Sequence, residues 1–192
     1  MNYLAHLYLS YPDPELMVGN FIADAVKGDD YNDYPERIKR GILMHRAIDD
    51  FTDHHPLVLE CKRYFSKEFD KYSGVLIDIY FDHLLARHFD HYSTLPLSLF
   101  ASRAYEILEK YQHLFPEKSN LFYGYMIREN ILENYASPEG IKRVLQGMTH
   151  RINKRFLLYE SIPAFVVHER SLYELFVPFF KELELNVAHF RA

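Results

Sequence analysis

The chain has 192 residues and a formal net charge of −5, because 27 acidic residues outnumber 22 lysines and arginines. This length suits one domain, residues 1–192, which buries roughly 70% of its unfolded surface and folds without disulfides, for which the single cysteine gives no framework. The acidic charge argues against nucleic-acid binding, and no apolar run of about 18 residues could span a membrane. The first residues lack the features of a signal peptide, so we expect a cytoplasmic protein.

Apolar residues recur at helical spacing along the chain, and no segment has clear strand alternation. Asp13 followed by Pro14 is typical of a helix start, while Pro163 and Pro178 are expected to kink or divide the last helix. The predicted helices cover residues 3–9, 14–28, 36–52, 57–70, 74–89, 97–114, 119–135, 138–150 and 153–190. We therefore predict an all-α single-domain helical bundle, with no sheet of more than two short strands.

The helix predicted over residues 36–52 carries a histidine and an aspartate, His45 and Asp49, among apolar residues. Side chains four residues apart lie on one side of a helix, with Cβ atoms roughly 6 Å apart. Arg46 and Asp50 occupy the neighbouring stripe, where we expect an ordinary surface ion pair. Asp49 instead faces an imidazole, which is an arrangement typical of metal sites.

Asp78 and Asp82 repeat this spacing within another apolar segment. Two like charges so placed repel each other, and their burial costs free energy unless a cation joins them. His83 adjoins the pair and supplies an imidazole, and Arg87 follows His83 by one helical turn. The segment thus offers a second set of groups for a cation.

Asp24 and His6 add an acid and an imidazole on two further apolar segments. Each has an ordinary interpretation, because a buried histidine is more often hydrogen-bonded than a ligand, and an acid near a helix end often caps it. Their occurrence together favours a metal site. Carboxylates and imidazoles suit Mn²⁺, Fe²⁺, Mg²⁺ or Zn²⁺. Since the motifs of di-iron bundles, zinc proteases and nucleotide-binding loops are absent from the sequence, a helical metal phosphohydrolase fits best.

Four segments carry these residues in order: MNYLAHLYLS, GNFIADAVKG, GILMHRAIDDFTD and DIYFDHLLARHF. Together they resemble the acyl carrier protein phosphodiesterase (acyl carrier protein hydrolase) family, strongly over residues 1–92 and more loosely over 144–152. That family is regarded as a divergent relative of the HD-type phosphohydrolases. The resemblance implies hydrolysis of 4′-phosphopantetheine from holo-acyl carrier protein to give the apo protein. It also implies a divalent cofactor, with Mn²⁺ as first candidate and Mg²⁺ or Fe²⁺ as alternatives.

The resemblance implies site residues at matching positions of this sequence. The expected metal ligands are acids and histidines, namely Asp24, His45, Asp78, Asp82 and His6. Asp49 or His83 would accept or steer protons. Arg46 or Arg87 would stabilise charge that develops on the phosphate.

An acidic carrier protein needs a local basic surface in order to dock on an acidic chain. The densest basic cluster comprises Lys142, Arg143, Arg151, Lys154 and Arg155. A second set, Arg37, Lys39 and Arg40, precedes His45, and a solvated helix face is the ordinary alternative for either. The sequence does not determine the oligomeric state. Two alternative functions also stay open. These are hydrolysis of a nucleotide or other small phosphoester, and non-catalytic binding by a helical protein without a metal.

Overall fold

A computed structural model describes residues 1–151 and 157–192, with the backbone alone for His150 and Arg151. Its α-helices are α1 Tyr3–Ser10, α2 Pro14–Ile22, α3 Glu36–His54, α4 Pro56–Phe69, α5 Ser73–Arg87, α6 Leu97–Lys110, α7 Glu117–Arg128, α8 Ile131–Asn134, α9 Pro138–Arg151 and α10 Ile162–Val187. Short 3₁₀ turns lie at Ala23–Ala25, Asp30–Asp33, Asp70–Tyr72, Phe89–His91, Gln112–Leu114, Leu158–Ser161 and Ala188–Phe190. No strand occurs in the described ranges, which confirms the all-α prediction. None of their helices is long and apolar enough to cross a bilayer.

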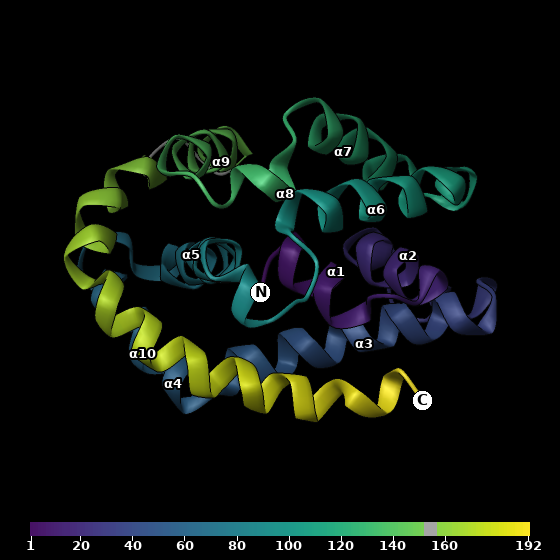
Figure 1. The fold of residues 1–192 in the computed structure, drawn as a ribbon, viewed down its shortest axis with the longest axis horizontal. Coiled ribbons are helices and arrows are strands. Elements are labelled where there is room, and N and C mark those ends of the chain that lie inside the picture. Colours follow the sequence, from purple (N-terminus) through teal and green to yellow (C-terminus); the bar gives the residue numbers. More distant parts are fainter. Residues whose placement is uncertain (152–156) are drawn as a thin grey trace.

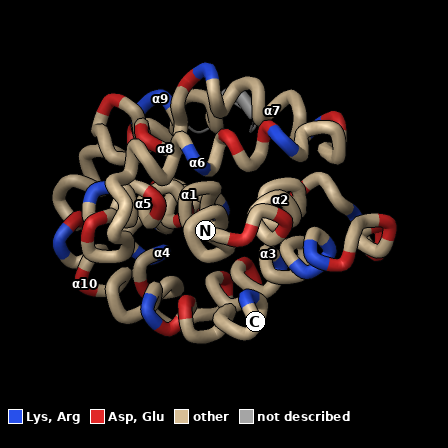
Figure 2. The backbone as a smooth tube through the Cα atoms, turned by 45° about the vertical axis from the view of Figure 1, so that its right-hand side comes forward, with Lys and Arg blue, Asp and Glu red and all other residues tan. Residues whose placement is uncertain are grey.

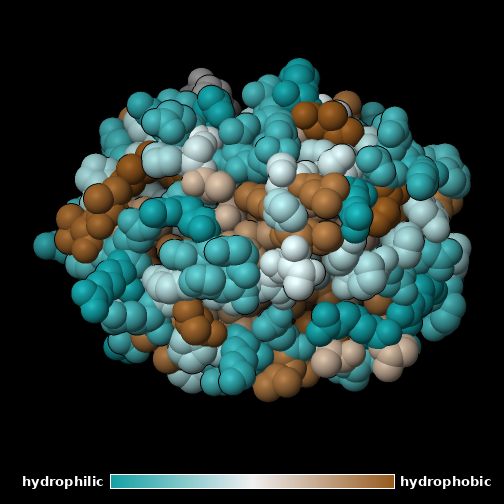
Figure 3. Space-filling view, viewed as in Figure 1, coloured by the Kyte–Doolittle hydropathy of each residue, from teal (hydrophilic) through white to brown (hydrophobic). Residues whose placement is uncertain are grey.

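The helices lie in three layers. Figure 1 shows α3, α4 and α10 on one side, α1, α2 and α5 in the middle, and α6 to α9 on the other side. The face in Figure 3 is mainly hydrophilic, with apolar side chains in separate patches. Helices of the middle layer are covered on two sides and are therefore buried over most of their circumference, as the burial of most residues of α1 and α2 illustrates. Polar groups on these helices need partners inside the protein.

Two glycines allow α2 and α3 to touch through their backbones. A Cβ atom built on Gly19 would overlap the carbonyl oxygen of Ile38 and lie 2.9 Å from Gly41 Cα. A Cβ atom built on Gly41 would overlap the carbonyl oxygen of Leu16. Only glycine fits at both positions. This crossing brings the residue after Gly19 against the helix turn that follows Gly41.

The structure corrects two predicted helices. α10 continues through Pro178 as one helix, so this proline does not divide it. Phe176 and Phe179, which flank Pro178 in the sequence, are buried against Phe81 of α5 and hold the helix in place, which offsets the lost hydrogen bond. The predicted helix over 119–135 is two helices, α7 and α8, because Asn130 has a left-handed backbone with φ of 43°. Part of the predicted basic cluster, Lys154 and Arg155, lies outside the described residues.

We predict that Gly41→Ala lowers the free energy of unfolding by about 1 to 3 kcal/mol, because the added methyl group must force α2 away from α3. The matched control is Gly124→Ala in α7, where a Cβ atom meets nothing within 4 Å. That control should raise stability by up to about 1 kcal/mol, since alanine favours a helix over glycine. Urea denaturation followed by circular dichroism measures both changes. Equal stabilities of the two variants would refute the close crossing.

Candidate functional site

A cavity of about 320 Å³ opens where α1, α3 and α5 meet. Besides the phenol of Tyr3, its titratable lining side chains are His6, Asp24, His45, Asp49, Asp53, Asp78 and Lys118. The amino group of Met1 also borders it. Acids therefore dominate this wall, and two imidazoles lie among them.

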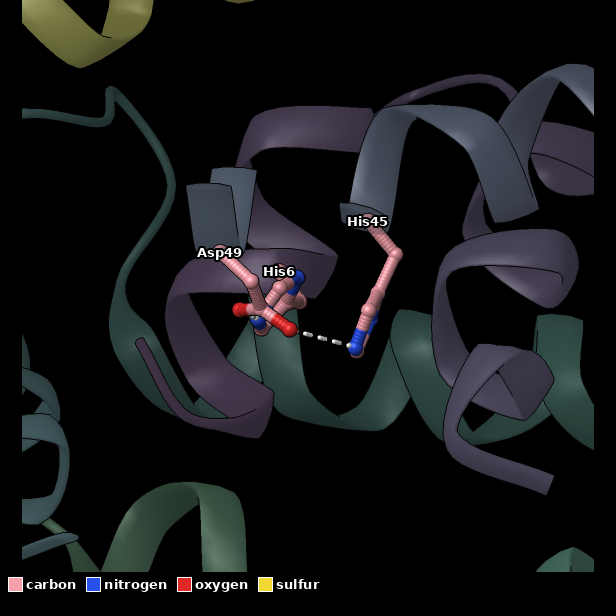
Figure 4. A group of neighbouring side chains, drawn as sticks. All are labelled: His6, His45 and Asp49. Carbon is pink, nitrogen blue, oxygen red and sulfur yellow. Dashed lines mark ion pairs between the residues drawn. The ribbon is translucent and has the colours of Figure 1, made fainter. Parts of the chain in front are cut away.

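Two histidines and an aspartate converge on one point, as Figure 4 shows, and all three line the cavity. The carboxylate of Asp49 lies between them, with Oδ1 3.2 Å from His6 Nε2 and Oδ2 3.1 Å from His45 Nε2. The imidazole rings are stacked, with centroids 4.0 Å apart. Asp24, in the 3₁₀ turn after α2, adds an oxygen 3.4 Å from His45 Nε2. The two imidazoles thus direct the same ring atom toward carboxylates.

A buried amide, Asn20, fixes both rings from behind. Its Nδ2 donates to the backbone oxygen of His6, which sets the orientation of the amide. His6 Nδ1 lies 2.7 Å from Asn20 Oδ1, and His45 Nδ1 lies 2.8 Å from the backbone oxygen of Asn20. Because these oxygens only accept hydrogen bonds, both Nδ1 atoms carry the proton. In its neutral form, each imidazole therefore presents the Nε2 lone pair to the cavity, as in metal-binding histidines.

Burial and neighbouring charges move the two histidines apart in pKa. Burial and the neighbouring His45 lower the pKa of His6 to about 4. Burial acts in the same direction on His45, but the carboxylates of Asp24 and Asp49 outweigh it and raise its pKa to about 9. Burial by itself raises the pKa of Asp49, yet the two neighbouring imidazoles, His45 first, hold it well below the ordinary value. The acids therefore favour positive charge at this point.

These groups fit a divalent cation by two further criteria. His6 Nε2 is buried and makes no hydrogen bond of good geometry within the described part of the chain, although Asp49 is near. Ligands at adjacent corners of an octahedron, each about 2.1 Å from an ion, lie about 3 Å apart. The candidate ligand atoms of His6, His45 and Asp49 all lie within 4.8 Å of one another, and Asp49 is near that spacing from both rings.

Asp78 borders the same cavity from α5. Its Oδ1 accepts a hydrogen bond of 2.9 Å from the amino group of Met1, which also lies 3.9 Å from Asp49 Oδ1. Burial raises the pKa of Asp78, while this amino group opposes the rise. Of the five predicted ligands, His6, Asp24, His45 and Asp78 thus meet at one cavity.

Asp82, the fifth predicted ligand, does not line the cavity. Its fully buried carboxylate accepts hydrogen bonds from the backbone N–H groups of Asn2, Leu4 and Ala5, at 3.3, 2.7 and 3.3 Å. The first amide groups of a helix have no hydrogen-bond acceptors within the helix, and the Asp82 carboxylate is the acceptor for those of α1. Burial raises the pKa of Asp82 to about 7 against these hydrogen bonds. Asp82 therefore positions α1, and through it His6.

His83 and Arg87, predicted to take part in chemistry, are engaged elsewhere. His83 Nδ1 donates to the backbone oxygen of Tyr135 at 2.6 Å. Arg87 forms an ion pair with Glu169 of α10. Neither residue lines the cavity, so the structure separates both from the candidate site.

Arg46 also points away from the cavity. Its guanidinium donates to the backbone oxygens of Val26 and Gly28 and lies over the ring of Tyr31. The expected surface pair with Asp50 is absent from the structure's ion pairs, and Asp50 contacts His54 instead. Arg46 thus ties the loop after α2 to α3.

Sequence reasoning missed Asn20, which supports the two imidazoles, and Lys118, which lines the cavity. The sequence indicated Asn20 only weakly, as an amide within an apolar helix one turn before Asp24. No sequence pattern indicated Lys118, because it comes from α7, far along the chain. Among the described residues, Lys118 is the only lysine or arginine that lines the cavity.

Comparisons with known proteins identify the family of this chain. Residues 1–183 match the family model of acyl carrier protein phosphodiesterase. The chain is 37% identical over 192 residues to an acyl carrier protein phosphodiesterase from Yersinia pestis, covering 98% of both chains. It is 35% identical over 182 residues to one from Serratia proteamaculans (strain 568), covering 94% of this chain and 93% of the relative. No solved structure matches significantly, so kinship with HD-type phosphohydrolases stays a prediction. The chain belongs to the acyl carrier protein phosphodiesterase family.

Proposed function

We propose that the protein hydrolyses the phosphodiester between 4′-phosphopantetheine and a serine of holo-acyl carrier protein. The name shared by its relatives supports this substrate. The observation that carries the proposal is the pair of imidazoles whose Nε2 atoms face Asp49 while Asn20 holds their Nδ1 atoms. Hydrolysis adds hydroxide to phosphorus and returns a proton to the serine oxygen, which gives the apo protein.

The proposed cation ligands are His6 Nε2, His45 Nε2 and the Asp49 carboxylate, with Asp24 beside them. A bound divalent cation supplies neutralisation of phosphate charge and activation of water. Mixed imidazole and carboxylate donors suit Mn²⁺, with Mg²⁺ or Fe²⁺ as alternatives. Asp78, on the same cavity, is the proposed proton acceptor in place of His83.

Lys118 is the proposed partner for a phosphate oxygen, in place of Arg46 and Arg87. Its exposed side chain lines the cavity opposite a predominantly acidic wall. An ammonium group there binds the anionic diester and stabilises charge that develops during hydrolysis.

The carrier protein is proposed to dock along α9. Lys142 is exposed on this helix, and Arg143 donates to Asn134 Oδ1 at its start. The side chain of Arg151 and residues Lys154 and Arg155 lie outside the described part, and they stay members of the proposed surface by sequence. Figure 2 shows acidic and basic segments interspersed over the helices, so docking requires such a local cluster. Met148 of α9 lines the cavity, so a partner bound along α9 lies near the proposed cation.

We predict that incubation with Mn²⁺ removes the phosphopantetheine arm from holo-acyl carrier protein, and that a chelator prevents it. Asp49→Ala should lower the rate by at least about 100-fold, because it removes a proposed ligand. Asp50→Ala is the matched control, since Asp50 is the next residue and contacts only exposed His54 among its ion pairs. Mass spectrometry of the carrier measures both reactions. Full activity of Asp49→Ala, or turnover in chelator, would exclude the proposed centre.

We predict that Asn20→Leu weakens Mn²⁺ binding about 10- to 100-fold, because His6 Nδ1 loses its side-chain acceptor and the ring is no longer held with Nε2 toward the cavity, whereas the backbone oxygen of residue 20 still holds His45. Asn20→Asp keeps a side-chain oxygen for His6 Nδ1 and should retain more of the affinity. The control is Asn32→Ala, which removes an exposed amide bonded to Asp29. Titration calorimetry measures the affinity, and circular dichroism checks that the helices persist. An unchanged affinity in folded Asn20→Leu would show that Asn20 does not position the ligands.

We predict that Lys118→Gln raises KM for holo-acyl carrier protein and weakens inhibition by inorganic phosphate by about tenfold, which corresponds to about 1.4 kcal/mol. Lys118→Arg should keep KM and phosphate inhibition close to the wild-type values, since it keeps the positive charge. Lys110→Gln, on the exposed side of α6, serves as the control. If inorganic phosphate inhibits Lys118→Gln as strongly as it inhibits the wild type, and KM is unchanged, the lysine does not bind phosphate.

A further inference from the structure

A second cavity, of about 260 Å³, adjoins the candidate site. The two cavities share Asn2, Tyr3 and Met148 in their linings. The second differs in chemistry, because its other walls are apolar or aromatic and come from α7, α8 and α9 and the turn after α8. A ligand with a charged end and an apolar body therefore fits across the junction.

Aromatic residues and a glycine shape this second cavity. Tyr3 stacks on Phe122, with ring centroids 4.2 Å apart and planes at 22°, and both rings line it. Gly147 lies inside α9, where glycine costs about 1 kcal/mol relative to alanine. A Cβ atom on Gly147 would lie 3.2 Å from the Tyr125 hydroxyl, tighter than ordinary contact. The glycine thus leaves open a space that any larger side chain would narrow.

We propose that this apolar cavity binds the branched aliphatic part of the pantetheine arm, next to the phosphate. This inference rests on the proposed function and adds the subsite that selects the arm. The carbon chain that follows the phosphate bears two methyl groups and then a hydroxyl and an amide. Val144, Phe122 and Tyr135 offer apolar contact for such a body, and Tyr125 and Asn2 bring polar groups to its edge. A phosphate near His6, His45 and Asp49 leaves these carbons at the junction, because the cavities adjoin there.

The test compares binding of free 4′-phosphopantetheine and of inorganic phosphate to the Mn²⁺-loaded protein by titration calorimetry. Gly147→Leu should weaken 4′-phosphopantetheine binding at least about tenfold, since leucine fills space that the methyl groups need. Inorganic phosphate should bind within about twofold of the wild type, because the cation site is untouched. Gly147→Ala should lose less affinity for 4′-phosphopantetheine. Val144→Phe, which changes the same wall, should lose about as much affinity as Gly147→Leu. Gly124→Leu is the matched control, because a Cβ atom there meets open space.

The outcomes separate this inference from the proposed function. A folded Gly147→Leu or Val144→Phe that binds 4′-phosphopantetheine like the wild type would overturn the subsite. So would a wild-type protein that binds 4′-phosphopantetheine no more tightly than inorganic phosphate, even if it hydrolysed the holo-carrier. Tight binding that depends on Gly147, without hydrolysis of the holo-carrier, would support the subsite and overturn the proposed function.

Discussion

The contact between Gly19 and Gly41 is the constraint on which the candidate site depends. Because neither residue carries a side chain, the backbones of α2 and α3 meet directly. Asn20 follows the first glycine, and His45 lies one turn beyond the second. At this separation Asn20 contacts both imidazoles. Its backbone oxygen lies 2.8 Å from His45 Nδ1, and its side-chain oxygen lies 2.7 Å from His6 Nδ1. A wider crossing would leave the rings free to turn.

Burial of the middle layer explains why its few polar groups are so informative. Unpaired polar groups inside a protein cost several kcal/mol, so each has a partner or a role. Asp82 accepts hydrogen bonds from the first amides of α1, and Asp78 accepts one from Met1. His6 Nε2 is the exception, because it is buried beside a carboxylate and makes no good hydrogen bond among the described residues. A cation at this point would engage that lone pair and balance the acids around it.

In the proposed function, recognition of the diester divides between two adjoining cavities. The first has imidazoles, carboxylates and Lys118, which act on charge. The second has aromatic and aliphatic walls, which act on shape and apolar area. Phosphate chemistry alone does not distinguish one diester from another, since every phosphodiester carries the same charged centre. The proposed apolar subsite supplies that distinction, and Tyr3, which borders both cavities, joins the two parts.

The sequence by itself determined the helical class, the shared face of His45 and Asp49, and the family, because helical periodicity and ordered motifs are local properties. Only the tertiary structure decided between Asp78 and Asp82. Both lie on one stripe of α5 at the same spacing as His45 and Asp49, yet the amides of α1 meet Asp82 and leave Asp78 at the cavity. The tertiary structure likewise brings Lys118, from the distant helix α7, to the site. Such choices depend on which neighbour packs against each helical turn, and no spacing within one helix contains that information.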